Sequence, residues 1–210
     1  MLSLETIIAY VATVLVLMST PGPSHLLMLS NSASHTFKRA TLTAFGDLSA
    51  NTLQIIAAGA GLAAALLASQ TIFNVIKWIG VAYLVWMGLR LILNAGRMNS
   101  QQAAQKASLK VLYLQGFLTS AANPKAVVFF AALFPQFIDP AFPVWPQIAA
   151  LGALYILIDG TFLMTYGLLA DRLTKRFASG SKIWLDRVSG SFLIISAILL
   201  GLKSVQGRVG

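Results

Sequence analysis

The chain has 210 residues, of which 57% are hydrophobic and only 10% are charged. A soluble domain carries about 25% charged residues, so this composition predicts an integral membrane protein and excludes most soluble enzyme folds. The formal net charge is +9, and because the basic residues lie between apolar runs, the expected contact is a lipid headgroup surface and no nucleic acid.

Six apolar segments are each long enough to cross about 30 Å of hydrocarbon as a helix that rises about 1.5 Å per residue. In chain order they lie near residues 4–35, 40–68, 72–94, 111–135, 146–170 and 184–204. The first segment contains Glu5 and no basic residue before Tyr10, so it lacks the start of a cleavable signal peptide. We expect it to stay in the mature protein as the first of six transmembrane helices.

Basic residues are concentrated in three of the connections between these segments. The first, third and fifth connections carry Lys38, Arg39, Arg90, Arg97, Lys106, Lys110, Arg172, Lys175, Arg176, Lys182 and Arg187. The opposite side has Lys77, Lys203 and Arg208. Because basic loops stay in the cytoplasm, both chain ends are expected on the periplasmic side.

The two halves of the chain show the same features in the same order. Each first segment has a proline break, each second segment one carboxylate, and each third segment two glycines. These are Pro21-Gly22-Pro23, Asp47, and Gly80 with Gly88, followed by Asn123-Pro124, Asp159, and Gly190 with Gly201. Because three crossings reverse direction, the pattern predicts two inverted three-helix repeats, residues 1–105 and 106–210, with broken first and fourth helices. The alternative is that Gly and Pro are simply common in membrane helices.

The two proline breaks are the first candidate binding elements. Proline removes a backbone donor and clashes with the preceding turn, so the segment Pro21-Gly22-Pro23-Ser24 is expected to split the first helix. Asn123 and Pro124 predict a restart in the fourth helix, because Asn favours the N-cap and Pro the first helical position. Each restart offers N–H groups to a substrate carboxylate, and Lys125 adds a cation. The alternatives are a plain kink and a lysine that extends to the membrane surface.

Two intramembrane carboxylates are the second candidate element. Asp47 lies in the second predicted helix and Asp159 near the middle of the fifth. A buried carboxylate is costly when charged, so each is a candidate proton carrier or a partner for a substrate ammonium. Asn51 follows Asp47 by four residues and shares its helical face. The alternative for each acid is a structural hydrogen bond or a pairing with Lys125.

The remaining polar residues are weaker candidates. Ser19, Thr20, Gln54 and Gln115 are expected mainly to hydrogen-bond neighbouring helices, and a histidine that packs between helices is the commoner reading of His25. The sequence contains no G-x-x-x-x-G-K-[ST], which argues against direct ATP drive. It has neither cysteine nor a His/Asp/Glu cluster with metal-ligand spacing, so no cofactor or metal is expected.

Three segments carry a resemblance to a known family. They are Ser19–Pro23, Lys77–Leu84 with Gly88, and Asn123–Lys125 running into Phe130–Phe137. Almost the whole chain resembles the LysE/RhtB-type amino-acid exporters of the bacterial inner membrane, most closely the homoserine/threonine/neutral amino-acid branch. The resemblance implies six membrane helices, export of amino acids or derivatives, and proton-motive drive as antiport. It implies a small amino acid, protons and membrane lipid as partners, leaves a homodimer open, and does not fix the cargo.

The sequence therefore predicts a secondary exporter that works by alternating access, and not an enzyme. The candidate substrate-binding residues are Pro21, Gly22, Pro23, Ser24, Asn51, Asn123, Pro124 and Lys125, and the candidate proton-coupling residues are Asp47 and Asp159.

Three alternatives to this reading stay open. A basic amino-acid exporter shares the same framework. An ion or metal-ion carrier of a related superfamily is less favoured, because two acids and one lysine suit a divalent cation poorly. An intramembrane aspartyl protease is suggested by two acids that could share a proton and by Gly46-Asp47, but Ala44 stands where that family has a glycine.

Overall fold

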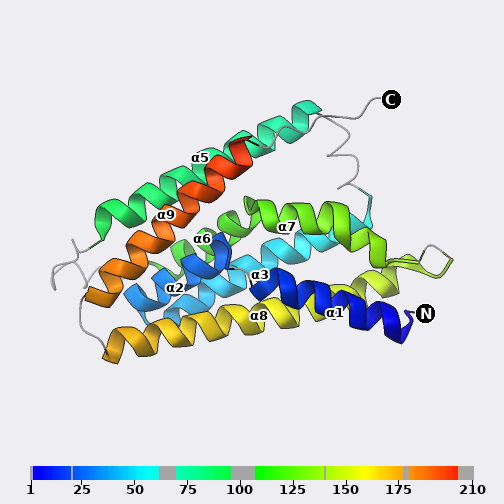
Figure 1. Cartoon of the computed structure of the whole chain (residues 1–210), viewed down its shortest axis with the longest axis horizontal. Coiled ribbons are helices and arrows are strands. Elements are labelled where there is room, and N and C mark those ends of the chain that lie inside the picture. The colour runs from blue at the N-terminus through cyan, green and yellow to red at the C-terminus, as the bar shows by residue number, and fades with distance from the viewer. Residues whose placement is uncertain are drawn as a thin grey trace.

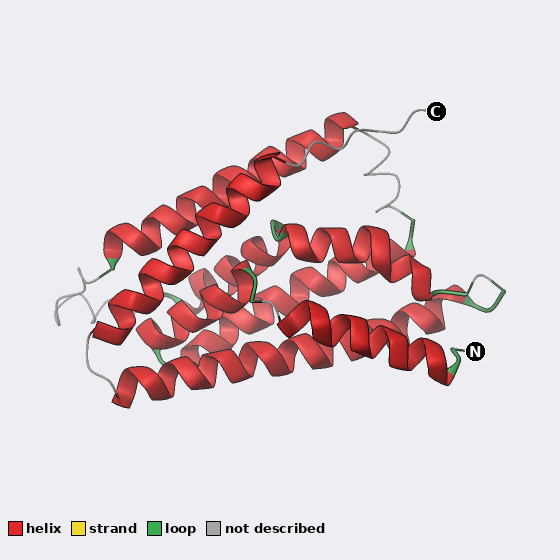
Figure 2. Cartoon of the chain, in the orientation of Figure 1, coloured by secondary structure: helices red, strands yellow, loops and turns green. Residues whose placement is uncertain are grey.

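The structure is a computed structural model that describes residues 2–19, 21–61, 70–95, 107–139, 141–176 and 180–202. Every regular element in these ranges is a helix, as Figure 2 shows, so the all-α class is confirmed. The elements are α1 (Leu4–Ser19), α2 (Pro23–His35), α3 (Phe37–Gly59), α5 (Gln70–Asn94), α6 (Leu109–Ala121), α7 (Pro124–Val128), the π-helix η2 (Phe129–Leu133), the 3₁₀ helix η3 (Phe134–Phe137), α8 (Val144–Arg176) and α9 (Gly180–Leu202).

The helices run between the two ends of an elongated bundle (Figure 1). The chain begins at one end, crosses through α1 and α2, and returns through α3. The corner between α2 and α3 and the end of α8 lie at the far end, while the turn before α8 lies at the same end as the N-terminus. The predicted boundary near residue 105 and the predicted helix ends at 62–68 and 203–204 lie outside the described residues.

The predicted break in the first helix is present. Helix α1 ends at Ser19 and α2 begins at Pro23, and the axes of the two helices differ by 55°. Gly22 is the N-cap of α2 with an extended backbone, φ −117° and ψ −178°. Pro23 stands at the first helical position, where its missing N–H leaves no hydrogen bond unmade. The sequence therefore restarts the helix at the expected residue.

The fourth helix is also broken where the sequence predicts it. Helix α6 ends at Ala121, and Asn123 has an extended backbone whose side-chain Oδ1 accepts the N–H of Lys125 at 3.0 Å. Pro124 begins α7, which then widens into the π-helix η2 and tightens into the 3₁₀ helix η3. The cap was predicted from the sequence, whereas the π-helical segment was not.

Buried aromatic rings hold α1, the segment after α7 and α8 together. Tyr10 packs its ring edge against Phe134, with centroids 6.1 Å apart, and its hydroxyl donates to the Leu151 carbonyl at 2.9 Å. Phe129 stacks on Tyr155 of α8 at 5.3 Å between centroids. Such ring pairs add about 0.5–1.5 kcal/mol each beyond the area they bury. This cluster fixes α8 beside both helix breaks.

Two close helix crossings depend on glycine. Gly46 of α3 lies against the backbone carbonyl of Tyr113 in α6, and Gly116 of α6 lies against that of Thr43, so a methyl group at either glycine would overlap the neighbouring backbone. Gly88 of α5 makes the corresponding contact with α9. Small residues at such positions let helix backbones approach closely, as in membrane bundles.

Apolar length alone identifies few of these helices as membrane spans. Among the described residues, one stretch, Val144–Thr174 in α8, is long and apolar enough to cross a membrane by itself. Helices α1 and α2 meet the same criteria only as a bent pair. Helix α3 is less apolar because it begins with Lys38 and Arg39 and carries Asp47 and Asn51. The count of six transmembrane helices therefore stays a prediction.

Candidate functional site

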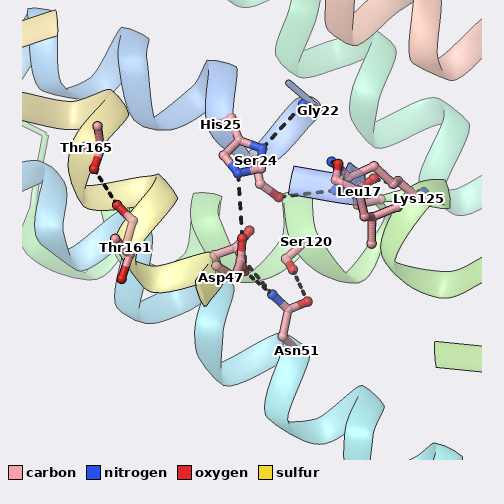
Figure 3. A network of polar contacts seen from close by, with 12 residues as sticks. Leu17, Gly22, Ser24, His25, Asp47, Asn51, Ser120, Lys125, Thr161 and Thr165 are labelled. Atoms are coloured by element: carbon pink, nitrogen blue, oxygen red, sulfur yellow. Dashed lines mark hydrogen bonds and ion pairs between the residues drawn. The ribbon is translucent and has the colours of Figure 1, made fainter. Parts of the chain in front are cut away.

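The breaks in the two helices lie near the middle of the elongated bundle (Figure 1), and Figure 3 shows Gly22 and Ser24 of the first break beside Lys125 of the second. The side-chain amide of Asn123 donates to Ser24 Oγ at 3.4 Å, which joins the start of α7 to the start of α2. Lys125 Nζ donates to the carbonyl of Leu17 at 2.7 Å, near the C-terminal end of α1. A methyl group on Gly22 would stand 3.7 Å from Lys125 Nζ. Residues predicted separately in the first and fourth helices therefore form one site.

The two predicted acids meet on a single asparagine. Asn51 Nδ2 donates to Asp47 Oδ2 at 2.9 Å and to Asp159 Oδ2 at 2.8 Å. Ser120 Oγ donates to Asn51 Oδ1 at 3.0 Å, which fixes the orientation of the amide. Asp47 is 2% exposed and Asp159 is 3% exposed. We refer to Asp47 and Asp159 as the acid pair.

Local sequence explains how these groups converge. Asp47 and Asn51 are four residues apart on α3, so both side chains point from the same helical face. Gly46 allows α6 to approach α3 closely, which brings Ser120 to Asn51. Asp159 comes from α8, which packs on α3. The acid pair therefore depends on a crossing of α3, α6 and α8.

His25 belongs to this site, although the sequence made it only a weak candidate. Its Nε2 lies 3.6 Å from Asp159 Oδ1, and its Nδ1 accepts the backbone N–H of Gly22 at 3.4 Å. The ring is 2% exposed and lies against the ring of Tyr166, with centroids 5.1 Å apart. The signal in the sequence was its place three residues after Gly22, where the side chain can reach back to the helix cap.

The other polar candidates lie in different places. Ser19 is exposed, and its hydroxyl donates to a carbonyl of its own helix, that of Val16. Gln115 accepts from the side chain of Asn31, away from the acid pair. Gln54 reaches the carbonyl of Ser120 at 3.3 Å, at the edge of the site.

Thr20 lies outside the described residues. Ser120 was missed from the sequence, where its one signal is a position three residues before the Asn123 cap.

The charges of the site do not balance. Lys125 interacts electrostatically with both Asp159 and Asp47, so two ionised carboxylates and one ammonium would leave one negative charge in excess. Within the described residues, Asp47 Oδ1 and His25 Nε2 are buried and have no hydrogen-bond partner. Buried polar atoms are nearly always satisfied, so Asp47 Oδ1 is a candidate acceptor for a proton, a water molecule or a cationic ligand group.

No group of three or more His, Cys, Asp or Glu side chains in the described ranges could hold a metal ion.

Comparison with known proteins gives a family match. The model of the family described as "LysE type translocator" matches residues 15–204 of this chain. The match includes both helix breaks and the acid pair.

Relatives with curated names agree with this match. An uncharacterized membrane protein of Vibrio cholerae is 31% identical over 92% of this chain and 95% of its own length. A homoserine/homoserine lactone efflux protein of Salmonella typhimurium is 30% identical over 93% of this chain and 96% of its own length. A leucine efflux protein of an Enterobacter strain is 30% identical over 62% of each chain. No solved structure gives a significant match.

Proposed function

The chain belongs to the LysE-type translocator family, and we propose that it exports small neutral amino acids or their derivatives across the bacterial inner membrane. The relatives named as efflux proteins for homoserine, homoserine lactone and leucine support this cargo class. The observation that carries the proposal is the acid pair held beside Lys125 at the meeting point of two broken helices. An enzyme is not proposed, because the family match is to translocators.

The site suits the two charged ends of an amino acid. The acid pair would hold the ammonium, since an intramembrane carboxylate needs a compensating charge. Lys125 would hold the carboxylate, assisted by the backbone around Gly22 and by Asn123. The remaining candidates, Pro21, Pro23, Ser24 and Pro124, would shape the two breaks. Asn51 would orient the acid pair, because its amide bonds both acids.

A proton is the proposed counter-substrate. One amide group donates to both carboxylates, so the two acids are close and a proton on one removes their mutual repulsion. A substrate ammonium would remove the same repulsion. Proton and ammonium therefore compete for one place, which is the requirement for antiport. One charge that moves through 100 mV releases about 2.3 kcal/mol.

Alternating access would follow from six membrane helices in two inverted repeats, residues 1–105 and 106–210. Each repeat would contribute one helix break and one acid to the site. Gly88 and Gly190, which lie in the third helix of the first repeat and the third helix of the second, contact each other. We propose that both termini lie in the periplasm, because the three connections rich in Lys and Arg would face the cytoplasm.

Export from lipid vesicles tests the proposal. The purified protein is reconstituted into vesicles preloaded with a panel of labelled amino acids, and efflux is measured with and without an inward-directed proton gradient. Under the gradient, we expect threonine, homoserine or leucine to leave vesicles that contain the protein faster than they leave protein-free vesicles. Preferential efflux of lysine or arginine would replace the proposal with a basic amino-acid exporter. Movement of metal ions in place of amino acids would replace it with an ion carrier.

A further inference from the structure

His25 connects the acid pair to the break in the first helix. On one side of the ring, Nε2 lies 3.6 Å from Asp159 Oδ1. On the other side, Nδ1 accepts the N–H of Gly22 at 3.4 Å. Gly22 is the N-cap of α2, so a single buried ring touches both a proton-binding group and the residue at which the helix restarts. Figure 3 shows His25 between Gly22 and Asp47.

The bond between His25 and Gly22 has the geometry of half a capping box. In a capping box the third residue of the helix accepts the N–H of the N-cap residue, and that third residue is usually Glu or Gln. An imidazole nitrogen accepts a hydrogen bond only while it carries no proton. The contact therefore assigns the ring hydrogen of His25 to Nε2, the nitrogen that faces Asp159. A proton on Nδ1 would leave Gly22 without its acceptor.

The groups around the ring come from several helices. On α8, Asp159 faces Nε2 and the phenol ring of Tyr166 packs on the imidazole. On α3, Asp47 completes the acid pair. On α7, Lys125 acts electrostatically on His25 and opposes a positive charge there. The imidazolium is therefore most favourable when both acids are ionised, and less favourable once a proton or an ammonium neutralises one of them.

We infer that His25 relays protons to the acid pair and reports the protonation of that pair to the helix break. A proton binds Nδ1 and forms an N–H bond there. The Nε2–H bond then breaks as its proton moves to Asp159 Oδ1, where an O–H bond forms. The ring ends neutral with its hydrogen on Nδ1, and Gly22 has lost its acceptor. Protonation of Asp159 along this route thus releases the cap of α2. This inference rests on the proposed proton-coupled export.

Two substitutions separate this relay from a packing role. His25→Asn places an amide oxygen near the position of Nδ1, so it can accept from Gly22 but cannot relay a proton. His25→Gln places its amide near Nε2 and tests the opposite contact. We expect both variants to retain more of the exchange of labelled for unlabelled substrate at equal pH than of the efflux driven by a pH gradient. Efflux driven by a pH gradient should fall by at least about tenfold, the scale of one lost charge-assisted hydrogen bond. His35→Asn is the matched control, because it replaces the other of the two histidines.

Nitrogen NMR of labelled histidine supplies a readout that packing alone would not change. In a His35→Gln background, His25 is the one histidine signal. At neutral pH we expect Nδ1 to be unprotonated and Nε2 to be protonated. On acidification Nδ1 should also become protonated. Asp159→Asn should shift the pH at which this happens, because it removes a charge that faces the ring. A hydrogen on Nδ1 at every pH would overturn the inference.

The outcomes also distinguish this inference from the proposed function. Gradient-driven efflux at the wild-type rate in His25→Asn would overturn the relay and leave the exporter intact. Loss of exchange at equal pH in folded, membrane-inserted His25→Asn would also overturn it, since His25 would then serve substrate binding or packing. If vesicles that contain the wild-type protein transport no amino acid, the proposed function itself is overturned, and with it the relay that rests on it.

Discussion

Gly88 and Gly190 contact each other reciprocally at the crossing of α5 and α9. A methyl group built on Gly88 would lie 2.6 Å from the carbonyl oxygen of Gly190, and one built on Gly190 would lie 2.6 Å from that of Gly88. Each glycine therefore lies directly against the backbone of the other. Helices α5 and α9 thus meet through backbone atoms.

Adding a methyl group at this crossing is expected to destabilise the protein. In Gly88→Ala the new Cβ would press on backbone, which cannot rotate away as a side chain can. We expect a loss of about 1–3 kcal/mol in unfolding free energy, seen as a lower melting temperature in detergent micelles. Gly160→Ala is the control, because its Cβ would meet only the flexible end of Leu48 at 3.4 Å. Equal melting temperatures for the two variants would contradict the close crossing.

The acid pair is expected to be essential for coupling. Asp47→Asn and Asp159→Asn remove an ionisable group with little change in shape. At least one of them should abolish efflux driven by a pH gradient while the protein remains folded in the membrane. Ser49→Ala is a suitable control, because Ser49 is half-buried on the same helix and its hydroxyl donates to the Phe45 carbonyl of that helix. Full gradient-driven efflux in the double variant would exclude both acids as proton carriers.

Lys125 is expected to bind the substrate carboxylate. Lys125→Met removes the charge, which should weaken binding of an amino acid by about 1.5–3 kcal/mol, or roughly 10- to 150-fold. The measurement is competition in vesicles between an amino acid and its carboxamide. Wild type should prefer the amino acid, and the preference should disappear in Lys125→Met. Lys125→Arg is the control, because it retains a cation near the Leu17 carbonyl.

A preference for the carboxylate that survives in Lys125→Met would assign Lys125 a different role. Its bond to Leu17 would then serve to cap the end of α1, where a cation is favourable next to the last carbonyls of a helix.

Membrane orientation can be tested with single cysteines, since the chain contains none. Ser3, Ser108 and Ala141 are all exposed in the structure. Cysteines at Ser3 and Ala141 should react with an impermeant thiol reagent added outside intact cells, and one at Ser108 should react only after lysis. The reason is the asymmetry of basic residues, which assigns the connection before Ser108 to the cytoplasm. The reverse labelling pattern would invert the proposed topology.

The sequence predicts the helices and their breaks well because these depend on local chemistry. The first predicted segment, 4–35, begins where α1 begins and ends where α2 ends. The Asn123 cap follows from the preference of Asn for the N-cap and of Pro for the first helical position. The contact of Asn51 with Asp159 could not be predicted, since the two residues are 108 positions apart and meet through packing. His25 was undervalued for the same reason, because its partner Asp159 lies on a helix far along the chain.

The polar face of α2 has a consequence for how the protein is made. Asn31 donates to Gln115, which is 84 residues further along the chain, and Ser32 donates to the carbonyl of Gly167, 135 residues further along. Both of these partners are synthesised long after α2, and lipid would offer the polar groups of α2 no hydrogen bonds. We therefore expect the packing of α2 to be completed only after α6 and α8 have been synthesised.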